Sequence, residues 1–138
     1  MTDPHLIISR MDRDSLARLA HLLSAAEIQV KKEPETGLLM MSARDAFATD
    51  FYLGEILVTT AAADYQGSPG FAMLLGEEPE RALLAAGVEA VLGSSHENLK
   101  HRLSRFLARQ AAVLARRDEK ERRLLAASRV SFETMVKR

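Results

Sequence analysis

Three apolar runs of strand length follow one another between residues 35 and 75, and they constrain the fold more than any other feature of the chain. The runs are residues 35–44, 51–61 and 71–75, separated by breaks at residues 45–50 and 67–70. Short apolar runs bounded by Gly, Pro and Asp are typical of β-strands. Because the second break, Gly67-Ser68-Pro69-Gly70, is a strong turn sequence, the simplest strand order is antiparallel.

Apolar residues recur at helical spacing only on either side of this sheet. Leucines between residues 12 and 26 predict an amphipathic helix with its N-cap among residues 12–15. A central helix is expected to begin near Pro79 and to end at Gly93, and a long basic helix is expected from about Glu97. The apolar stripe expected on the central helix is Leu83, Leu84, Val88, Val91 and Leu92.

Several details of the sheet, expected over residues 28–75, follow from single residues. Pro34 should stop a short extended segment, so that the main sheet begins at Thr36. Gly54 marks a bulge or a close approach of the backbone. Residues 38–43 are apolar on both faces, which predicts either a central strand covered on both sides or a strand that faces a partner. Leu38 and Met40 are therefore candidate partner-binding residues.

The C-terminal third raises two further questions. The polar run at residues 118–123 interrupts the apolar stripe of the long helix, so the helix either leaves the domain there or bends. After it, residues 128–136 alternate through Val130 and Phe132 in a segment that a small domain need not bury. We expect this segment to be an extended tail that docks on another subunit. Its candidate partner-binding residues are Arg129, Val130, Phe132 and Met135.

These elements predict an α+β fold in a single domain over residues 1–138. An antiparallel β-meander would be covered by an N-terminal helix and a central helix, followed by a long basic C-terminal helix and an extended tail. The chain has 138 residues, 47% of them hydrophobic and 28% charged, as in ordinary soluble domains. No apolar run approaches the roughly 20 residues that span a bilayer, and the N-terminus lacks a signal peptide pattern. A cytoplasmic protein without a membrane segment is the default expectation.

The neutral net charge conceals a strong asymmetry. Residues 1–99 contain 7 Lys or Arg and 15 Asp or Glu, whereas residues 100–138 contain 12 and 4. The basic third is a solvated face, a face for an anionic ligand or a face for an acidic partner, and composition alone does not rank these readings. The candidate anion-facing residues are Arg102, Arg105 and Arg109.

The motifs of self-contained enzymes are missing. The chain has no Cys, no phosphate-binding Gly-rich loop and no nucleophile elbow, and its four His residues are scattered. Glu55 and Arg44 have the chemistry of a general base and an anion clamp, but charged residues at a sheet edge more often guard that edge. We therefore expect no cofactor and no metal site, and the sequence assigns no catalytic residue.

Four separated segments resemble one known family. They are residues 35–44, with Glu35-Thr36-Gly37-Leu38, Met40, Met41 and Arg44; residues 51–59, Phe-Tyr-Leu-Gly-Glu-Ile-Leu-Val-Thr; Leu75-Gly76 with the Ala-rich helix after it; and residues 128–136, Ser-Arg-Val-Ser-Phe-Glu-Thr-Met-Val. In this order they resemble the PhnG family, the small G subunit of the carbon-phosphorus lyase core complex. The pattern from Arg129 to Met135 is the most specific of them, and the resemblance covers nearly the whole chain.

The resemblance implies an accessory subunit in phosphonate catabolism. The implied partners are the H, I and J subunits, chiefly the large I subunit, with an ATP-binding-cassette-like L protein also needed. In the implied step, methylphosphonate replaces adenine on the ribose of ATP to give α-D-ribose 1-methylphosphonate 5-triphosphate. The family view places the chemistry on the I and J subunits, so ATP and methylphosphonate are substrates of the assembly.

Three alternatives remain open at this point. A stand-alone nucleic-acid-binding domain would use the basic helix against phosphates, although interleaved aromatic residues and an overall basic charge are missing. A small independent enzyme would need a nucleophile, cofactor loop or metal set that the sequence does not show. An isolated chain is also expected to pair with itself, as a homo-oligomer, through the surface meant for a partner.

Overall fold

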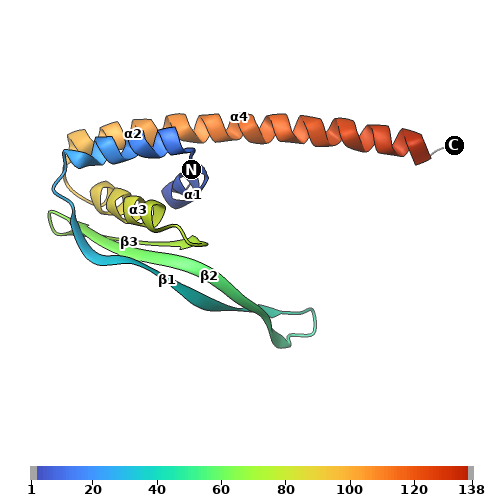
Figure 1. Ribbon diagram of the computed structural model, residues 1–138, viewed down its shortest axis with the longest axis horizontal. Coiled ribbons are helices and arrows are strands. Elements are labelled where there is room, and N and C mark those ends of the chain that lie inside the picture. Colours follow the sequence, from blue (N-terminus) through green and yellow to red (C-terminus); the bar gives the residue numbers. More distant parts are fainter. Residues whose placement is uncertain (1–2, 137–138) are drawn as a thin grey trace.

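A computed structural model describes the backbone of residues 3–136 and the side chains of residues 3–129 (Figure 1). The elements are, in chain order, α1 (Pro4–Arg10), α2 (Arg13–Ser24), β1 (Gln29–Arg44), β2 (Asp50–Tyr65), β3 (Ser68–Leu75), α3 (Pro79–Leu92) and α4 (Glu97–Val136). The three strands form one antiparallel sheet in the order β1-β2-β3. The predicted α+β class and the meander are therefore confirmed.

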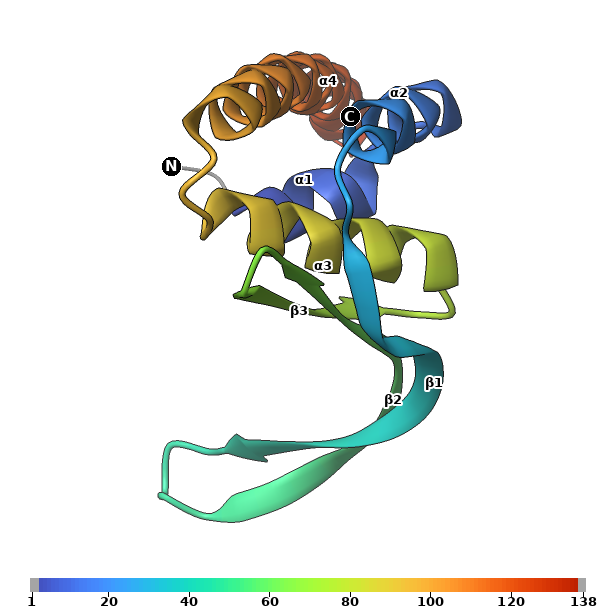
Figure 2. The ribbon, with the colours of Figure 1, turned by 90° about the vertical axis from the view of Figure 1, so that its left-hand side faces the viewer.

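The helices lie on one face of the sheet. Figure 2 shows α3 against the strands, α1 beside it, and α2 and α4 side by side one layer further out. Asp12 caps α2 as predicted, because its Oδ1 accepts a hydrogen bond from the Ser15 N–H at 2.7 Å. The sequence reasoning missed α1, although Asp3 caps it and Pro4 occupies its first turn. Seven residues are too few to show a helical period.

The helix α3 approaches the sheet through small residues, because Ala82, Ala85, Ala86 and Ala90 are fully buried. Of the predicted stripe, Val88 and Val91 are fully buried as well, whereas the three leucines are only partly buried. Gly70 on β3 allows this close approach, because a Cβ there would lie 2.0 Å from the carbonyl oxygen of Ala86. Large side chains on this face would hold α3 away from the sheet.

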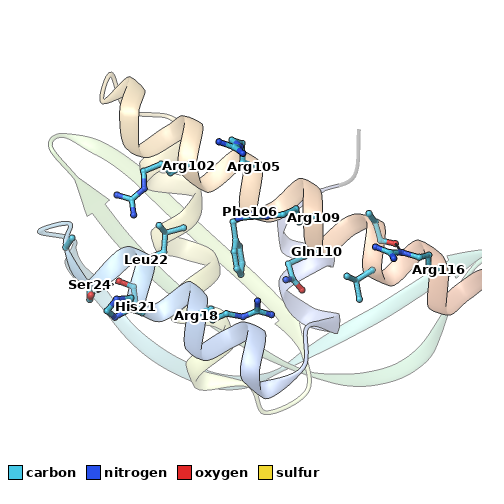
Figure 3. Close-up of a pocket in the computed structure, with 13 residues that line it drawn as sticks. Arg18, His21, Leu22, Ser24, Arg102, Arg105, Phe106, Arg109, Gln110 and Arg116 are labelled. Carbon is cyan, nitrogen blue, oxygen red and sulfur yellow. Dashed lines mark hydrogen bonds between the residues drawn. The ribbon is translucent and has the colours of Figure 1, made fainter.

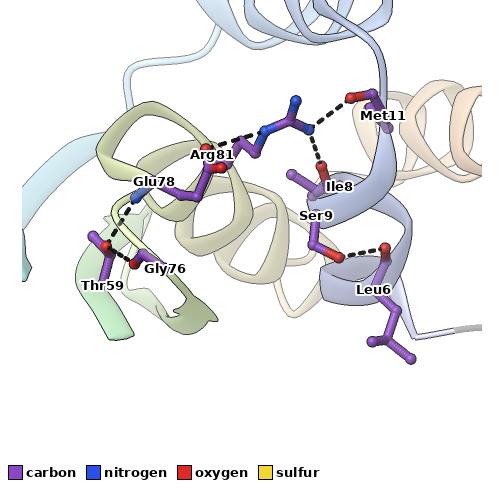
Figure 4. A network of polar contacts seen from close by, with 8 residues as sticks. All are labelled: Leu6, Ile8, Ser9, Met11, Thr59, Gly76, Glu78 and Arg81. Atoms are coloured by element: carbon purple, nitrogen blue, oxygen red, sulfur yellow. Dashed lines mark hydrogen bonds and ion pairs between the residues drawn. The ribbon is translucent and has the colours of Figure 1, made fainter. Parts of the chain in front are cut away.

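Two polar side chains connect these layers (Figure 4). The fully buried Thr59 on β2 donates to the carbonyl of Gly76 at 2.6 Å and accepts from the N–H of Glu78 at 2.9 Å. Arg81 on α3 donates to the carbonyls of Ile8 and Met11, at 2.8 and 2.7 Å. These bonds satisfy backbone groups at the start of α3 and after α1, where helix ends leave such groups unpaired, and they add a second bond to the Ile8 carbonyl, which also accepts from the Met11 N–H.

The strands β1 and β2 are twice as long as β3, and this difference shapes the molecule. β3 pairs only with residues 58–65 of β2, so residues 37–57 form a two-stranded ribbon that extends beyond the helices. We call this ribbon the arm. Pro34 does not interrupt β1, because it lies at a register shift on an edge strand, where a missing N–H is tolerated.

Two glycines stand where the backbone needs them. Gly54 has a φ of +134° beside a register shift in the pairing of β1 with β2, which confirms the predicted bulge. The turn between β2 and β3 is centred on Gln66 and Gly67, which both have positive φ. This turn lies slightly before the predicted one, and Pro69 and Gly70 belong to β3.

The 40 residues of α4 run without a break from Glu97 to Val136. Its first half packs on the compact part of the molecule outside the arm, which we call the body. From residue 119 onward, the described side chains of α4 are exposed. Of the two alternatives, the helix therefore leaves the body rather than bending (Figure 1). The prediction of an extended tail at residues 128–136 is wrong, because these residues continue α4. Once a helix has formed, adding further residues to it is favourable, and α4 contains no Gly or Pro that would stop it. The short alternating pattern is too weak to break this helix.

Candidate partner interface

On the face of the sheet opposite the helices, β3 carries large apolar side chains, whereas β1 carries polar residues such as Lys32 and Glu35. Buried and exposed residues alternate along β3, and the exposed Phe71, Met73 and Leu75 lie on the face that none of the described helices covers (Figure 2). An antiparallel sheet with helices on one side normally carries polar side chains on the other. Large apolar side chains in this position indicate a surface that another protein covers.

This apolar surface continues from β3 onto the arm. Leu75 pairs with Val58, and the register of β1 with β2 then places the pair Leu39 and Ile56 further along the same face. Met41, two residues beyond Leu39, extends the row toward the tip of the arm. The side chains of Leu39 and Met41 are both exposed. We call this row, from Phe71 to Met41, the outer stripe.

The other face of the arm is apolar as well. Leu38 is paired with Leu57 and Met40 with Glu55, and the exposed fractions of Leu38 and Met40 are 66% and 57%. The structure thus brings together two of the predicted partner-binding residues. The sequence allowed either a central strand covered on both faces or a strand that faces a partner. The first alternative is wrong, because β1 is an edge strand and its residues 37–42 in the arm are exposed.

Polar contacts hold the tip of the arm and present an aromatic residue. Arg44 Nε donates to Asp50 Oδ1 at 2.8 Å, and Nη2 donates to Oδ2 at 3.3 Å. The pKa of Arg44 is raised by this hydrogen bonding. Asp45 Oδ1 accepts from the N–H groups of Phe47 and Thr49, at 2.8 and 2.9 Å.

Phe47 is 89% exposed at this tip. The sequence reasoning did not single it out, although an aromatic residue inside a polar turn was a usable signal. Arg44, for which the sequence favoured an edge guard over an anion clamp, forms an ion pair with Asp50. Glu55 lies on the arm opposite Met40, so it is not part of any enclosed site in the described chain.

A second surface lies between α2 and α4 (Figure 3). Here a groove with a volume of about 840 Å³ runs along the two helices. The three predicted anion-facing residues, Arg102, Arg105 and Arg109, all line it together with Arg116 of the same basic helix, and the structure adds Arg18 from α2. Sequence reasoning did not include Arg18, because only the packing of α2 beside α4 brings it there.

The predicted residues of the C-terminal segment lie elsewhere. Arg129 is exposed on the part of α4 that projects from the body, and Figure 1 shows this part of the helix well apart from the arm. The backbone of Val130, Phe132 and Met135 is helical, while the burial of their side chains lies outside the described part of the chain. The structure therefore divides the candidate residues between the arm and α4.

The histidines and acids make local contacts. His96 Nδ1 accepts from the N–H of Leu99 at 3.2 Å near the start of α4, and its ring packs edge-on against Tyr65. His5 pairs with Glu89 at 3.3 Å. Within residues 3–129, His, Asp and Glu do not form any group of three or more that could hold a metal ion. Nor does any helix in the described range combine the length and the apolar character needed to cross a membrane.

Comparison with known proteins identifies the family of this chain. The family model described as "Phosphonate metabolism protein PhnG" matches residues 5–138 of the chain. A search of the curated proteins finds no match. The match covers both candidate surfaces and the whole of α4. The resemblance seen in the sequence is thus confirmed, and the chain belongs to the PhnG family of phosphonate metabolism proteins.

Proposed function

We propose that this chain is an accessory, non-catalytic subunit of the carbon-phosphorus lyase core complex in the cytoplasm. The reaction in which this subunit would assist is the displacement of adenine from ATP by methylphosphonate, which gives α-D-ribose 1-methylphosphonate 5-triphosphate. The proposed partners are the H, I and J subunits, chiefly the large I subunit. Membership of the PhnG family supports a role in phosphonate metabolism, and the shape of the chain supports the role of a subunit.

The observation that carries this proposal is the arm. A two-stranded ribbon is marginally stable in water by itself, and a third strand or a packed layer normally supports it. In this chain the ribbon is apolar on both faces, with Leu38 and Met40 on one and Leu39 and Met41 on the other. Burial of such side chains contributes about 1.5–3 kcal/mol each. A partner that covers the arm therefore stabilises it and gains affinity.

Co-expression with the large I subunit tests the proposal. We expect the wild-type chain to co-purify with it, and we expect the double variant Leu38→Ser/Met40→Ser to lose most of this association while its thermal midpoint stays unchanged. The matched control is Leu6→Ser, because Leu6 on α1 is 58% exposed, as Met40 is to 57%, but lies away from the sheet. This control should co-purify normally.

Two results would contradict the proposal. One is a wild-type chain that stays monomeric and binds none of the lyase subunits. The other is triphosphate-product formation by the remaining subunits at an undiminished rate without this chain. A lowered thermal midpoint of the double variant would instead assign Leu38 and Met40 to the stability of the chain itself.

A second candidate function is nucleic-acid binding, which the arginine-lined groove favours. Guanidinium groups bind phosphates with two parallel hydrogen bonds. However, one aromatic residue, Phe106, lines the groove, whereas single-strand binding sites use several exposed aromatic rings for stacking. Fluorescence anisotropy with labelled single-stranded and duplex oligonucleotides at physiological salt separates the two functions, and tight binding there would favour the second.

A further inference from the structure

We infer that the groove between α2 and α4 is a second docking site, and that it takes an acidic amphipathic helix of a partner protein. This inference rests on the proposed role as a subunit, because it adds an interface on the side of the molecule opposite the outer stripe. The family match does not assign any function to this groove.

The groove carries positive charge without any compensating charge. Its walls include Arg18, Arg102, Arg105, Arg109 and Arg116 but no carboxylate. Among the side chains of residues 3–129, none of these five is in an ion pair, whereas Arg117 next to them pairs with Asp12 at 3.3 Å. Like charges along one groove repel each other, so a bound polyanion stabilises the pair of helices.

The arrangement of these arginines fits a long ligand. The α4 arginines follow the spacings i, i+3, i+7 and i+14, which keeps them on neighbouring turns of one side of the helix. At about 1.5 Å per residue they extend over roughly 21 Å. Figure 3 shows Arg102 and Arg116 at opposite ends of the row, with Phe106 between them, so the guanidinium groups do not converge on one point. A small phosphate compound would need such convergence.

The floor of the groove is apolar. Phe106, which is buried, and Leu22, which is partly buried, lie on the inner sides of α4 and α2, and Val113 and Ala25 extend the floor. The groove between two adjacent helices has a shape into which a third helix can pack. An amphipathic helix can place its apolar stripe on this floor and its flanking Asp or Glu residues against the arginines. An oligonucleotide or a polyphosphate would leave the floor unused.

Charge reversal in the assembled complex tests the inference. The variant Arg102→Glu/Arg105→Glu/Arg109→Glu should weaken association with the co-expressed subunits at least about tenfold, with a steeper effect at low salt. The matched control is Arg13→Glu/Lys31→Glu/Lys100→Glu, which makes the same charge change at residues outside the groove, the arm and the projecting half of α4. An equal loss in the control would overturn the inference. A comparison of circular dichroism spectra and thermal midpoints would show that each variant is folded.

Cross-linking identifies the occupant. In the variant Arg105→Lys/Arg109→Lys, a carbodiimide should join the new amines to Asp or Glu residues of one helical segment in a partner, and those links should be absent from the wild-type complex. Links only to a second copy of this chain, or no new links, would overturn the inference. Binding of inorganic tripolyphosphate to the assembled complex, lost in the triple groove variant, would also overturn it, because it would show a groove open to small anions.

The two proposals fail in different ways. If the arm variant Leu38→Ser/Met40→Ser loses association while the groove variant keeps it, the subunit role stands and the groove inference is wrong. If the wild-type chain does not associate with any subunit, both are wrong.

Discussion

Gly70 lies where β3 passes closest to α3, and one methyl group there should be intolerable. An added Cβ would lie 2.0 Å from the Ala86 carbonyl oxygen and 2.6 Å from the Ala90 nitrogen, both of them backbone atoms that cannot rotate away. We expect Gly70→Ala to lower the free energy of unfolding by about 3 kcal/mol or more, as severe overpacking does. Urea denaturation of the variant measures this loss. Gly37→Ala is the control, because a Cβ at Gly37 meets no atom within 4 Å. Equal stabilities of the two variants would mean that α3 does not contact the sheet so closely.

Asp118 and Arg10 connect α4 to α1, and their contact should make stability depend on acid. Arg10 Nη2 donates to Asp118 Oδ1 at 2.6 Å, and hydrogen bonding to Arg10 lowers the pKa of Asp118 from its ordinary 3.8. Because the pKa is lower in the folded chain, the contribution to stability is complete above the unfolded pKa and is lost as the pH falls through the folded pKa.

We therefore expect Asp118→Asn to lower the thermal midpoint slightly at pH 7 and to flatten its decline below about pH 4. The effect is small and disappears at high salt, because both side chains are largely exposed. Thermal melts between pH 7 and pH 3 measure it. Arg10→Gln should have the same effect, and the double variant should add little to either change. Additive losses would show that the two residues act separately. Asp12, whose pKa is lowered by its capping bond to Ser15, retains its own acid dependence in all of these variants.

At the scale of elements, the projecting half of α4 should serve association rather than folding. The described side chains from residue 119 onward are exposed, and the ion pairs of Arg117 and Asp118 lie where the described part of α4 leaves the body. We predict that Phe132→Ala weakens co-purification with the large subunit clearly, because truncation of an aromatic anchor at an interface costs about 2 kcal/mol or more. Its thermal midpoint in isolation should equal that of the wild type.

A matched variant and a deletion sharpen this test. Ser131→Ala changes the neighbouring residue without removing an apolar anchor, so it should behave as the wild type does. Deletion of residues 128–138 should abolish association and leave the body folded. Unfolding of the isolated chain after the deletion would mean that the C-terminal segment stabilises the body. Association that persists in both Phe132→Ala and the deletion variant would mean that the segment does not bind the partner.

At the scale of the whole molecule, the isolated chain should bind apolar probes and associate with itself. The outer stripe and the arm together expose many large apolar side chains, and apolar surface of this kind usually marks an interface. We expect strong fluorescence with 8-anilinonaphthalene-1-sulfonate, and a molecular mass by light scattering that rises with concentration. Both signals should fall when the large subunit is added, and both should be reduced in Phe71→Lys/Met73→Lys. An isolated chain that stays monomeric without binding the dye would contradict this reading of the surface.

Much of this molecule could be predicted from the order of its residues. Asp12 and Pro79 mark helix starts, Gly93 marks a helix end, and Gly54 marks a bulge, because each of these features depends on contacts within a few residues. The antiparallel meander followed in the same way from apolar runs separated by turns. The family could also be predicted, because its pattern extends over nearly the whole chain.

Only the tertiary structure decided which surfaces stay uncovered. Residues 38–43 fit a buried or an exposed strand equally well, and the choice depended on β3 ending before it reached the arm. Arg18 joined Arg102 only because α2 packs beside α4, and the alanines rather than the leucines of α3 face the sheet because Gly70 permits a close approach. Local preferences act over one or two turns of chain, whereas burial and the meeting of side chains depend on contacts between residues far apart in sequence. The sequence by itself therefore determined the elements and the family, and long-range packing determined which apolar and basic surfaces stay exposed.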